Sequence, residues 1–160
     1  SIGDLNLGAK WQVIESCPLG ARHALAAAVK LPTADEDKDM GSGEVDGDLT
    51  WIVSRSIGEK AGVHLNVGYS WIGGPDDDVI HYGLAADYQL LDAVQWVGEV
   101  FADNELTNDA DTVAQFNTGF RWTPVESLTV DLAAGSKVTD DAPDFTATAG
   151  LTWAFGFNDN

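Results

Sequence analysis

The sequence predicts an all-β fold, an antiparallel up-and-down transmembrane β-barrel of about nine strands. Apolar and polar residues alternate with a period of two along almost all of the 160 residues, and the helical period of 3.6 is nearly absent. No stretch approaches the roughly 18 consecutive apolar residues that a membrane-spanning helix requires. Strands, which alternate, cross a bilayer without such a stretch.

The last strand shows the alternation most clearly. Phe145, Leu151 and Trp153 fall on one face, and Thr148 and Gly150 fall on the other. Eight similar segments of about 9–12 residues precede it, a length that suits a tilted strand crossing a bilayer. They are residues 4–15, 21–32, 47–56, 61–72, 79–90, 94–103, 112–122 and 127–138.

The connections between these strands alternate in length. Short turns are predicted at 16–20, 57–60, 91–93 and 123–126, and longer Asp-rich loops at 33–46, 73–78, 103–111 and 139–144. Tight turns at one end and long loops at the other are typical of outer-membrane barrels, in which the tight turns face the periplasm. Residues 1–160 are expected to form one domain. Because simple bacterial barrels have an even number of strands, strands preceding residue 1 are expected to be missing, or one strand is miscounted.

The less apolar face decides between a soluble and a membrane barrel. A soluble barrel exposes many long charged side chains to water. Here this face instead carries small or uncharged residues, with about one charge per strand. The opposite face is bulky and apolar, as in Leu65, Val67 and Leu132. We therefore predict that the apolar face points outward into lipid and that the small-residue face lines the lumen.

Aromatic residues of outward parity support the same orientation, because they are expected near the strand ends. Two belts of such rings mark the bilayer interfaces of membrane barrels. Those near the tight turns are Trp11, Trp96, Trp122, Trp153, Phe155 and Phe157, and those near the long loops are Trp51, Trp71 and Tyr82.

Four segments together resemble a known family. They are residues 3–10, residues 31–43 with their Leu-Pro-Thr-Ala-Asp and Met-Gly-Ser-Gly motifs, residues 139–145 and residues 149–153. The chain resembles, over essentially its whole length, the outer-membrane family labelled "MetA-pathway of phenol degradation", whose members are regarded as transporters. The resemblance implies passage of small, including aromatic, solutes.

Hairpin registers place several charged residues together inside the lumen. We expect Asp87 close to Glu99, His64 opposite Asp87, and Arg121 beside Asp131, with Lys10 and Lys30 adding positive charge from the first two strands. These residues are predicted either to filter solutes in a pore or to form an internal salt-bridge network that plugs it. No serine is evident beside His64 or His81, and we expect no enzymatic activity.

The long loops carry most of the acidic residues, 16 of 26, in a chain of net charge −18. Asp35, Asp37 and Asp39 have the spacing of calcium ligands, but Met40 stands where a calcium loop needs glycine, so a solvated acidic loop is the alternative. The expected partners are outer-membrane lipid and lipopolysaccharide, bridged by divalent cations, and no nucleic acid, which this charge would repel.

Two functions from different classes are compatible with these features of the sequence. The first is a channel or transporter in the bacterial outer membrane for small molecules, hydrophobic or aromatic ones included. The second is a structural or interaction barrel with an occluded lumen. Neither the solute nor the oligomeric state follows from the sequence.

Overall fold

The computed structural model describes residues 3–34, 42–107 and 110–155, and nine strands run through them. All are antiparallel to their neighbours, in the order of the sequence, which confirms the all-β up-and-down prediction. The strands are β1 (Leu5–Ile14), β2 (Ala21–Leu31), β3 (Asp46–Ile57), β4 (Ala61–Trp71), β5 (Val79–Leu91), β6 (Val94–Glu105), β7 (Thr112–Val125), β8 (Leu128–Lys137) and β9 (Thr146–Trp153).

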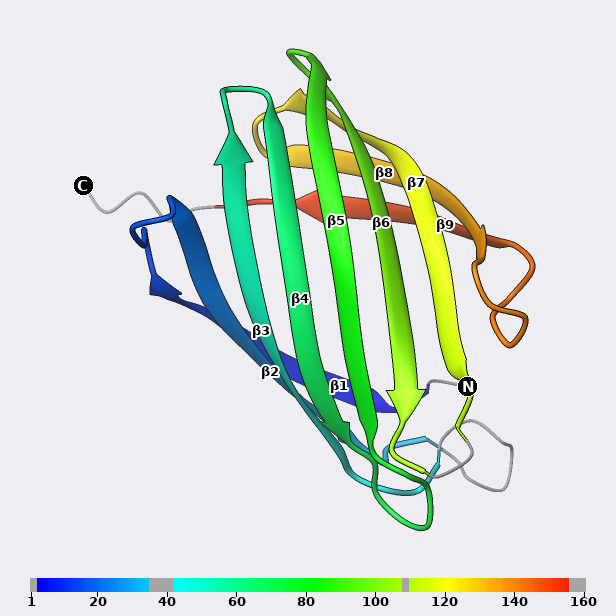
Figure 1. Ribbon diagram of the computed structural model, residues 1–160. Coiled ribbons are helices and arrows are strands. Elements are labelled where there is room, and N and C mark those ends of the chain that lie inside the picture. The colour runs from blue at the N-terminus through cyan, green and yellow to red at the C-terminus, as the bar shows by residue number, and fades with distance from the viewer. Residues whose placement is uncertain (1–2, 35–41, 108–109, 156–160) are drawn as a thin grey trace.

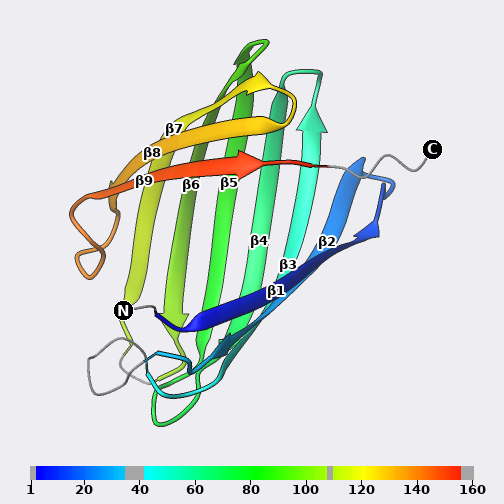
Figure 2. The same ribbon diagram turned by 180° about the vertical axis from the view of Figure 1, so that it is seen from behind.

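The single sheet is strongly curved, and its two edge strands, β1 and β9, lie on the same side of the molecule (Figures 1 and 2). They are not paired with each other, so the sheet is not closed into a barrel in this structure. Figure 2 shows the concave side of the sheet, which carries the face that the sequence predicts to line a lumen. None of the described residues forms a helix that could cross a membrane.

The tight turns and the long loops lie at opposite ends of the strands, as predicted (Figure 1). The β3–β4 turn consists of residues 58–60, and Gly58 has a φ of 63° there. Gly20, in the β1–β2 turn, has a φ of 69°. Both angles lie in the left-handed region that glycine adopts without steric cost, which explains these two residues.

The two faces of the sheet differ as the alternation requires. Leu65, Val67, Leu132 and Leu151 have exposed fractions of 42%, 40%, 59% and 70%. His64, Asp87 and Glu99 have the opposite parity in their strands, and the registers place them on a common face. We call this the inner face and the apolar one the outer face. The buried apolar core of the described chain contains alanines only, Ala21, Ala102, Ala114 and Ala142.

Most of the large aromatic residues of the outer face lie near strand ends. Trp11, Trp122 and Trp153 lie near the tight turns and Trp71 near a long loop, with exposed fractions between 49% and 71%. Trp51 differs from the prediction, because it lies in the middle of β3, where it stacks on His23 with ring centroids 5.6 Å apart. Phe157 lies outside the described residues.

Candidate functional site

One continuous chain of hydrogen bonds runs along the inner face across five consecutive strands. Ser54 Oγ lies 2.9 Å from His64 Nδ1, and His64 Nε2 lies 2.7 Å from Asp87 Oδ1. Gln95 Nε2 donates to Asp87 Oδ2 at 2.9 Å, and Arg121 donates to Gln95 Oε1 at 2.9 Å. Each of β3, β4, β5, β6 and β7 contributes one side chain. We call this set the five-strand chain.

The carboxylate of Asp87 determines which atoms donate and which accept along this chain. A carboxylate only accepts, so the His64 Nε2 that contacts it carries a proton. In the neutral imidazole, Nδ1 then accepts a hydrogen bond from the Ser54 hydroxyl group. Asp87 is also half-buried, with 19% of its side chain exposed, and the imidazole and the Gln95 amide replace the water that it loses.

A glycine makes the contact between His64 and Asp87 sterically possible. In the ladder between β4 and β5, Asp87 pairs with Gly62, and His64 pairs with Ala85. A Cβ atom at Gly62 would lie 2.6 Å from Asp87 Oδ1 and 3.2 Å from His64 Nε2. The hydrogen bond therefore occupies the space above Gly62, and any larger residue there would displace it.

The same arrangement recurs at three other places on the inner face. His81 is paired with Gly68, Asn117 with Gly135, and Asp131 with Gly150. In each case the polar side chain lies over its glycine, where an added Cβ atom would collide with it. We call these pairs and the Gly62–Asp87 pair the polar–glycine pairs. In each pair, the polar side chain occupies the space that glycine leaves free, so the concave face has room for it.

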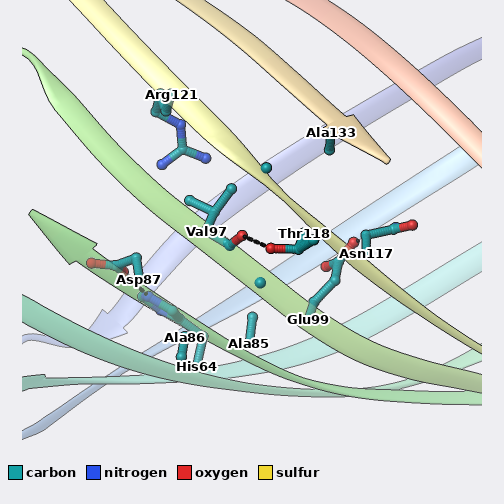
Figure 3. Close-up of a pocket in the computed structure, with 12 residues that line it drawn as sticks. His64, Ala85, Ala86, Asp87, Val97, Glu99, Asn117, Thr118, Arg121 and Ala133 are labelled. Carbon is teal, nitrogen blue, oxygen red and sulfur yellow. Dashed lines mark hydrogen bonds and ion pairs between the residues drawn. The ribbon is translucent and has the colours of Figure 1, made fainter. Parts of the chain in front are cut away.

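A cavity of about 220 Å³ lies on the inner face beside the five-strand chain (Figure 3). His64, Asp87, Glu99 and Arg121 all line it, so four of the residues predicted for the lumen lie together. Glu99 is exposed, and its Oε1 accepts a hydrogen bond of 2.9 Å from Asn117. Asp87 and Glu99 share the cavity but make no hydrogen bond to each other.

The predicted pairings hold at the level of strands and differ at the level of side chains. Arg121 pairs with Asp131 in the β7–β8 ladder, as expected. Its guanidinium group, however, turns to Gln95, and the Asp131 carboxylate lies over Gly150. His64 is displaced by two residues from the register that would set it opposite Asp87, and the side chains still meet diagonally.

The two predicted lysines lie apart from this cavity. Lys30 is the second-last residue of β2, near the long loops. Its Nζ lies 2.5 Å from Asp46 and 3.9 Å from Asp4 and donates a hydrogen bond to Ser42. Lys10 lies exposed on the edge strand β1, opposite Ala26. A charge of inward parity is therefore not sufficient to place a residue at the cavity, because the strand order separates β1 and β2 from β5–β7.

Sequence reasoning does not predict Ser54, Gln95 or a second histidine cluster. His81 Nε2 lies 2.6 Å from Asp48 Oδ2, and Ser70 and Thr50 donate to the same carboxylate at 2.9 and 2.8 Å. A pattern of opposite charges does not point to hydroxyl or amide side chains. The register of β3 and β4 is a signal that identifies Ser54, because it pairs directly with His64.

The contact between Ser54 and His64 corrects the expectation that no serine lies beside a histidine. Ser54, His64 and Asp87 make the contacts of a Ser-His-Asp triad, in which a serine nucleophile also needs donors for an oxyanion. Ser54 pairs with Arg22 on one side and with His64 on the other, so the main-chain N–H groups around it belong to the sheet ladders. This arrangement offers no main-chain oxyanion hole.

The acidic loop expected to bind calcium lies largely outside the described residues, with Asp35, Asp37 and Asp39 among the omitted positions. Within the described part of the chain, no group of three or more His, Cys, Asp or Glu side chains is arranged to hold a metal ion.

Two groups outside the strands have shifted pKa values. The hydrogen bond from Tyr69 lowers the pKa of Asp78, and the His23 side chain lowers the pKa of Cys17 to about 7.

The sequence matches one family over residues 1–155, and that family is described as "Putative MetA-pathway of phenol degradation". This is the family that the sequence motifs resemble. The chain has no match among curated proteins.

Replacing Gly62 with alanine should destabilise the protein by about 1–3 kcal/mol, because the new methyl group displaces the hydrogen bond between His64 and Asp87. Urea unfolding in lipid vesicles measures this change. Gly8→Ala is the control, since its Cβ would lie 3.3 Å from a carbonyl oxygen and meet no polar side chain. If Gly62→Ala costs as much in an Asp87→Asn background as in the parent, the glycine does not act through this contact.

Alkylation of Cys17 by iodoacetamide should reach half its maximal rate near pH 7, because the thiolate is the reactive form and its pKa is about 7. His23→Ala removes the main cause of this shift. Its midpoint should rise toward 9.0, the ordinary value, and the reaction at pH 7 should slow. His81→Ala, on the other face, should leave the midpoint unchanged. Equal midpoints in the parent and His23→Ala would contradict the role of His23.

Proposed function

The chain belongs to the family described above as acting in phenol degradation, and on this premise we propose that it forms the wall of a channel or transporter in the bacterial outer membrane. The solutes are small molecules, hydrophobic and aromatic ones included. The chain supplies a path for diffusion and is not an enzyme. Its surroundings are outer-membrane lipid and lipopolysaccharide.

The observation that carries this proposal is the exposure of the outer face. Large apolar side chains on every strand are exposed there, with values of 62% for Leu84, 70% for Leu151 and 71% for Trp11. A soluble monomer rarely exposes a contiguous apolar area of this kind. In a bilayer the same side chains contact acyl chains, and their exposure costs nothing.

The inner face supports a wet path rather than a dry core. Among the described residues, Glu99 and Arg121 make no ion pair with each other or with another charged side chain. Each is hydrogen-bonded instead to a neutral amide, Asn117 or Gln95. A plugged lumen would instead bury such charges and pair them with one another, since an unpaired buried charge is costly.

A complete wall also requires partners for the two edge strands. β1 and β9 each pair on one side only within the described sheet. Open sheet edges do not persist in the hydrocarbon region of a bilayer, because unpaired N–H and C=O groups there cost several kcal/mol each. We therefore include in the proposal further strands that join β1 to β9 and give the even number expected of a bacterial barrel.

Val67→Arg should destabilise the protein in lipid by about 2–4 kcal/mol, because it places a charge on the outer face at the middle of β4. Thr148→Arg is the control on the inner face, where Thr148 is exposed and pairs with the small residue Ala133. It should change stability by less than about 1 kcal/mol. Both are measured by urea unfolding in vesicles. Equal costs would contradict the assignment of the two faces.

Glu99→Gln and Arg121→Gln should shift the ion selectivity of a planar-bilayer current in opposite directions, because each removes one exposed charge of opposite sign from neighbouring strands. Loss of Glu99 favours anions and loss of Arg121 favours cations, and unfolding free energies should barely change. The reversal potential in a salt gradient measures the shift. A silent parent protein with a loss of about 1–3 kcal/mol in each variant would instead establish the occluded barrel.

A further inference from the structure

Among the Phe, Tyr and Trp residues of the nine strands, Phe101 alone lies on the inner face. The strand registers give all the others outward parity. Phe101 instead shares the parity of Glu99 and pairs with Gly83 on one side and Gln115 on the other. Contact with lipid explains the outward rings but not a ring that faces the lumen.

Phe101 lines a cavity of about 270 Å³, in the half of β6 that leads to the long loops. Small residues of β5 form one side of it, because Gly83 pairs with Phe101 and Ala85 pairs with Glu99. A Cβ atom at Gly83 would lie 3.2 Å from the Cβ atom of Phe101. The glycine therefore leaves space beside the aromatic residue. We call this space the Phe101 cavity.

Two carboxylates flank the aromatic residue on its own strand. Glu99 and Asp103 lie two residues before and after Phe101, so all three side chains leave β6 on the inner face. Residues two apart on a strand are roughly 7 Å from each other. Both carboxylates line the Phe101 cavity, and neither makes an ion pair with a lysine or arginine of the described residues.

The nearest basic side chains do not neutralise these two carboxylates. His81 pairs with Asp103 in the ladder and lines the cavity, but its Nε2 lies 2.6 Å from Asp48. If His81 were protonated, its single charge would still face three carboxylates. Arg121 lies four residues along β7 from the register partner of Glu99, which is roughly 13 Å, and does not line this cavity.

The lysines near the long loops have partners of their own. Lys30 Nζ lies 2.5 Å from Asp46, and Lys137 Nζ lies 2.9 Å from Asp144. Most of the acidic residues of the chain also belong to the long loops at this end. The Phe101 cavity therefore lies in a negative field, which attracts cations.

An acceptor without a donor lies on the β4 side of the cavity. Asn66 pairs with Gly83 and lines the cavity, and its Oδ1 is buried and accepts no hydrogen bond from the described residues. A buried acceptor without a donor is costly, and rotation of the amide about its Cβ–Cγ bond would present this oxygen to a donor in the cavity. The cavity thus offers an aromatic ring and oxygen acceptors, which together complement a cation that donates hydrogen bonds.

We propose that the Phe101 cavity binds a small organic ammonium ion, held against the Phe101 ring between the carboxylates of Glu99 and Asp103. The proposal rests on the channel function proposed above and gives it a substrate class. The face of an aromatic ring attracts a cation, and the two carboxylates add to the attraction. A volume of about 270 Å³ lies close to the lower end of the range of ligand pockets and suits a single-ring solute.

A metal ion fits this cavity less well than an organic cation. Glu99 and Asp103 are four residues apart on one strand, roughly 13 Å, so they do not converge on one ion. The described residues also contain no group of three or more His, Cys, Asp or Glu side chains arranged to hold a metal. An aromatic ring between two carboxylates matches an ion that has an apolar part as well as a charge.

Isothermal titration of the full chain in an uncharged detergent tests the site without requiring a pore, with the detergent alone as the blank. Benzylammonium is the probe, and benzyl alcohol, a neutral molecule of similar size, is the control ligand. Benzylammonium should bind at least about tenfold more tightly than benzyl alcohol. Glu99→Gln and Asp103→Asn should each weaken benzylammonium by about tenfold, and Phe101→Leu by about fivefold.

Two matched variants make the same chemical changes away from the cavity. Glu126→Gln removes a carboxylate from the β7–β8 turn at the opposite end, and Phe116→Leu replaces a ring on the outer face of β7. Each should change benzylammonium affinity by less than about twofold. Equal binding of the two ligands, or losses in these variants equal to those in Asp103→Asn and Phe101→Leu, would overturn the cation site.

The site and the channel can fail separately. Benzylammonium binding that depends on Phe101 and Asp103, in a protein without conductance in planar bilayers, would support the site and refute the channel. Conductance with no preference of the protein for benzylammonium over benzyl alcohol would refute the site alone.

Discussion

The inner face depends on one steric constraint, which is that each polar–glycine pair places a large polar side chain opposite a residue without one. At these positions the polar side chain folds over the neighbouring strand, and a Cβ atom on that strand would collide with it. Gly62 provides the space in which His64 reaches Asp87, and Gly135 does so for Asn117. The contacts that cross the strands therefore depend on which residues are glycine as much as on which are charged.

This constraint also explains how far the sequence predicts the site. The strands are predictable to within a few residues, because each combines a period of two with a turn signal at its ends. The register that places Arg121 opposite Asp131 follows from the short turn that connects β7 and β8. The direction of each side chain does not follow, because it depends on local space. Arg121 turns toward Gln95, and the Asp131 carboxylate lies over Gly150.

The difference between Glu99 and Asp87 shows a second limit of sequence reasoning. Both are carboxylates of inward parity on adjacent strands, and their spacing in the sequence suggests one shared cluster. The ladder sets Asp87 opposite Val97 and Glu99 opposite Ala85, so their nearest polar neighbours lie on different strands. Asp87 bonds to His64, and Glu99 bonds to Asn117. The amide groups of Gln95 and Asn117 donate to these two carboxylates and so belong to separate networks. An amide carries no charge, so a pattern of charged residues does not predict its contacts.

The five-strand chain has a mechanical consequence. Its four hydrogen bonds run transverse to the strands, and two of them, His64–Asp87 and Gln95–Arg121, link side chains of separate hairpins. These links resist any motion that moves the strands from β3 to β7 apart. In the proposed channel, these five side chains would narrow the path at the level where they lie. Solutes would then be selected by size before they are selected by charge.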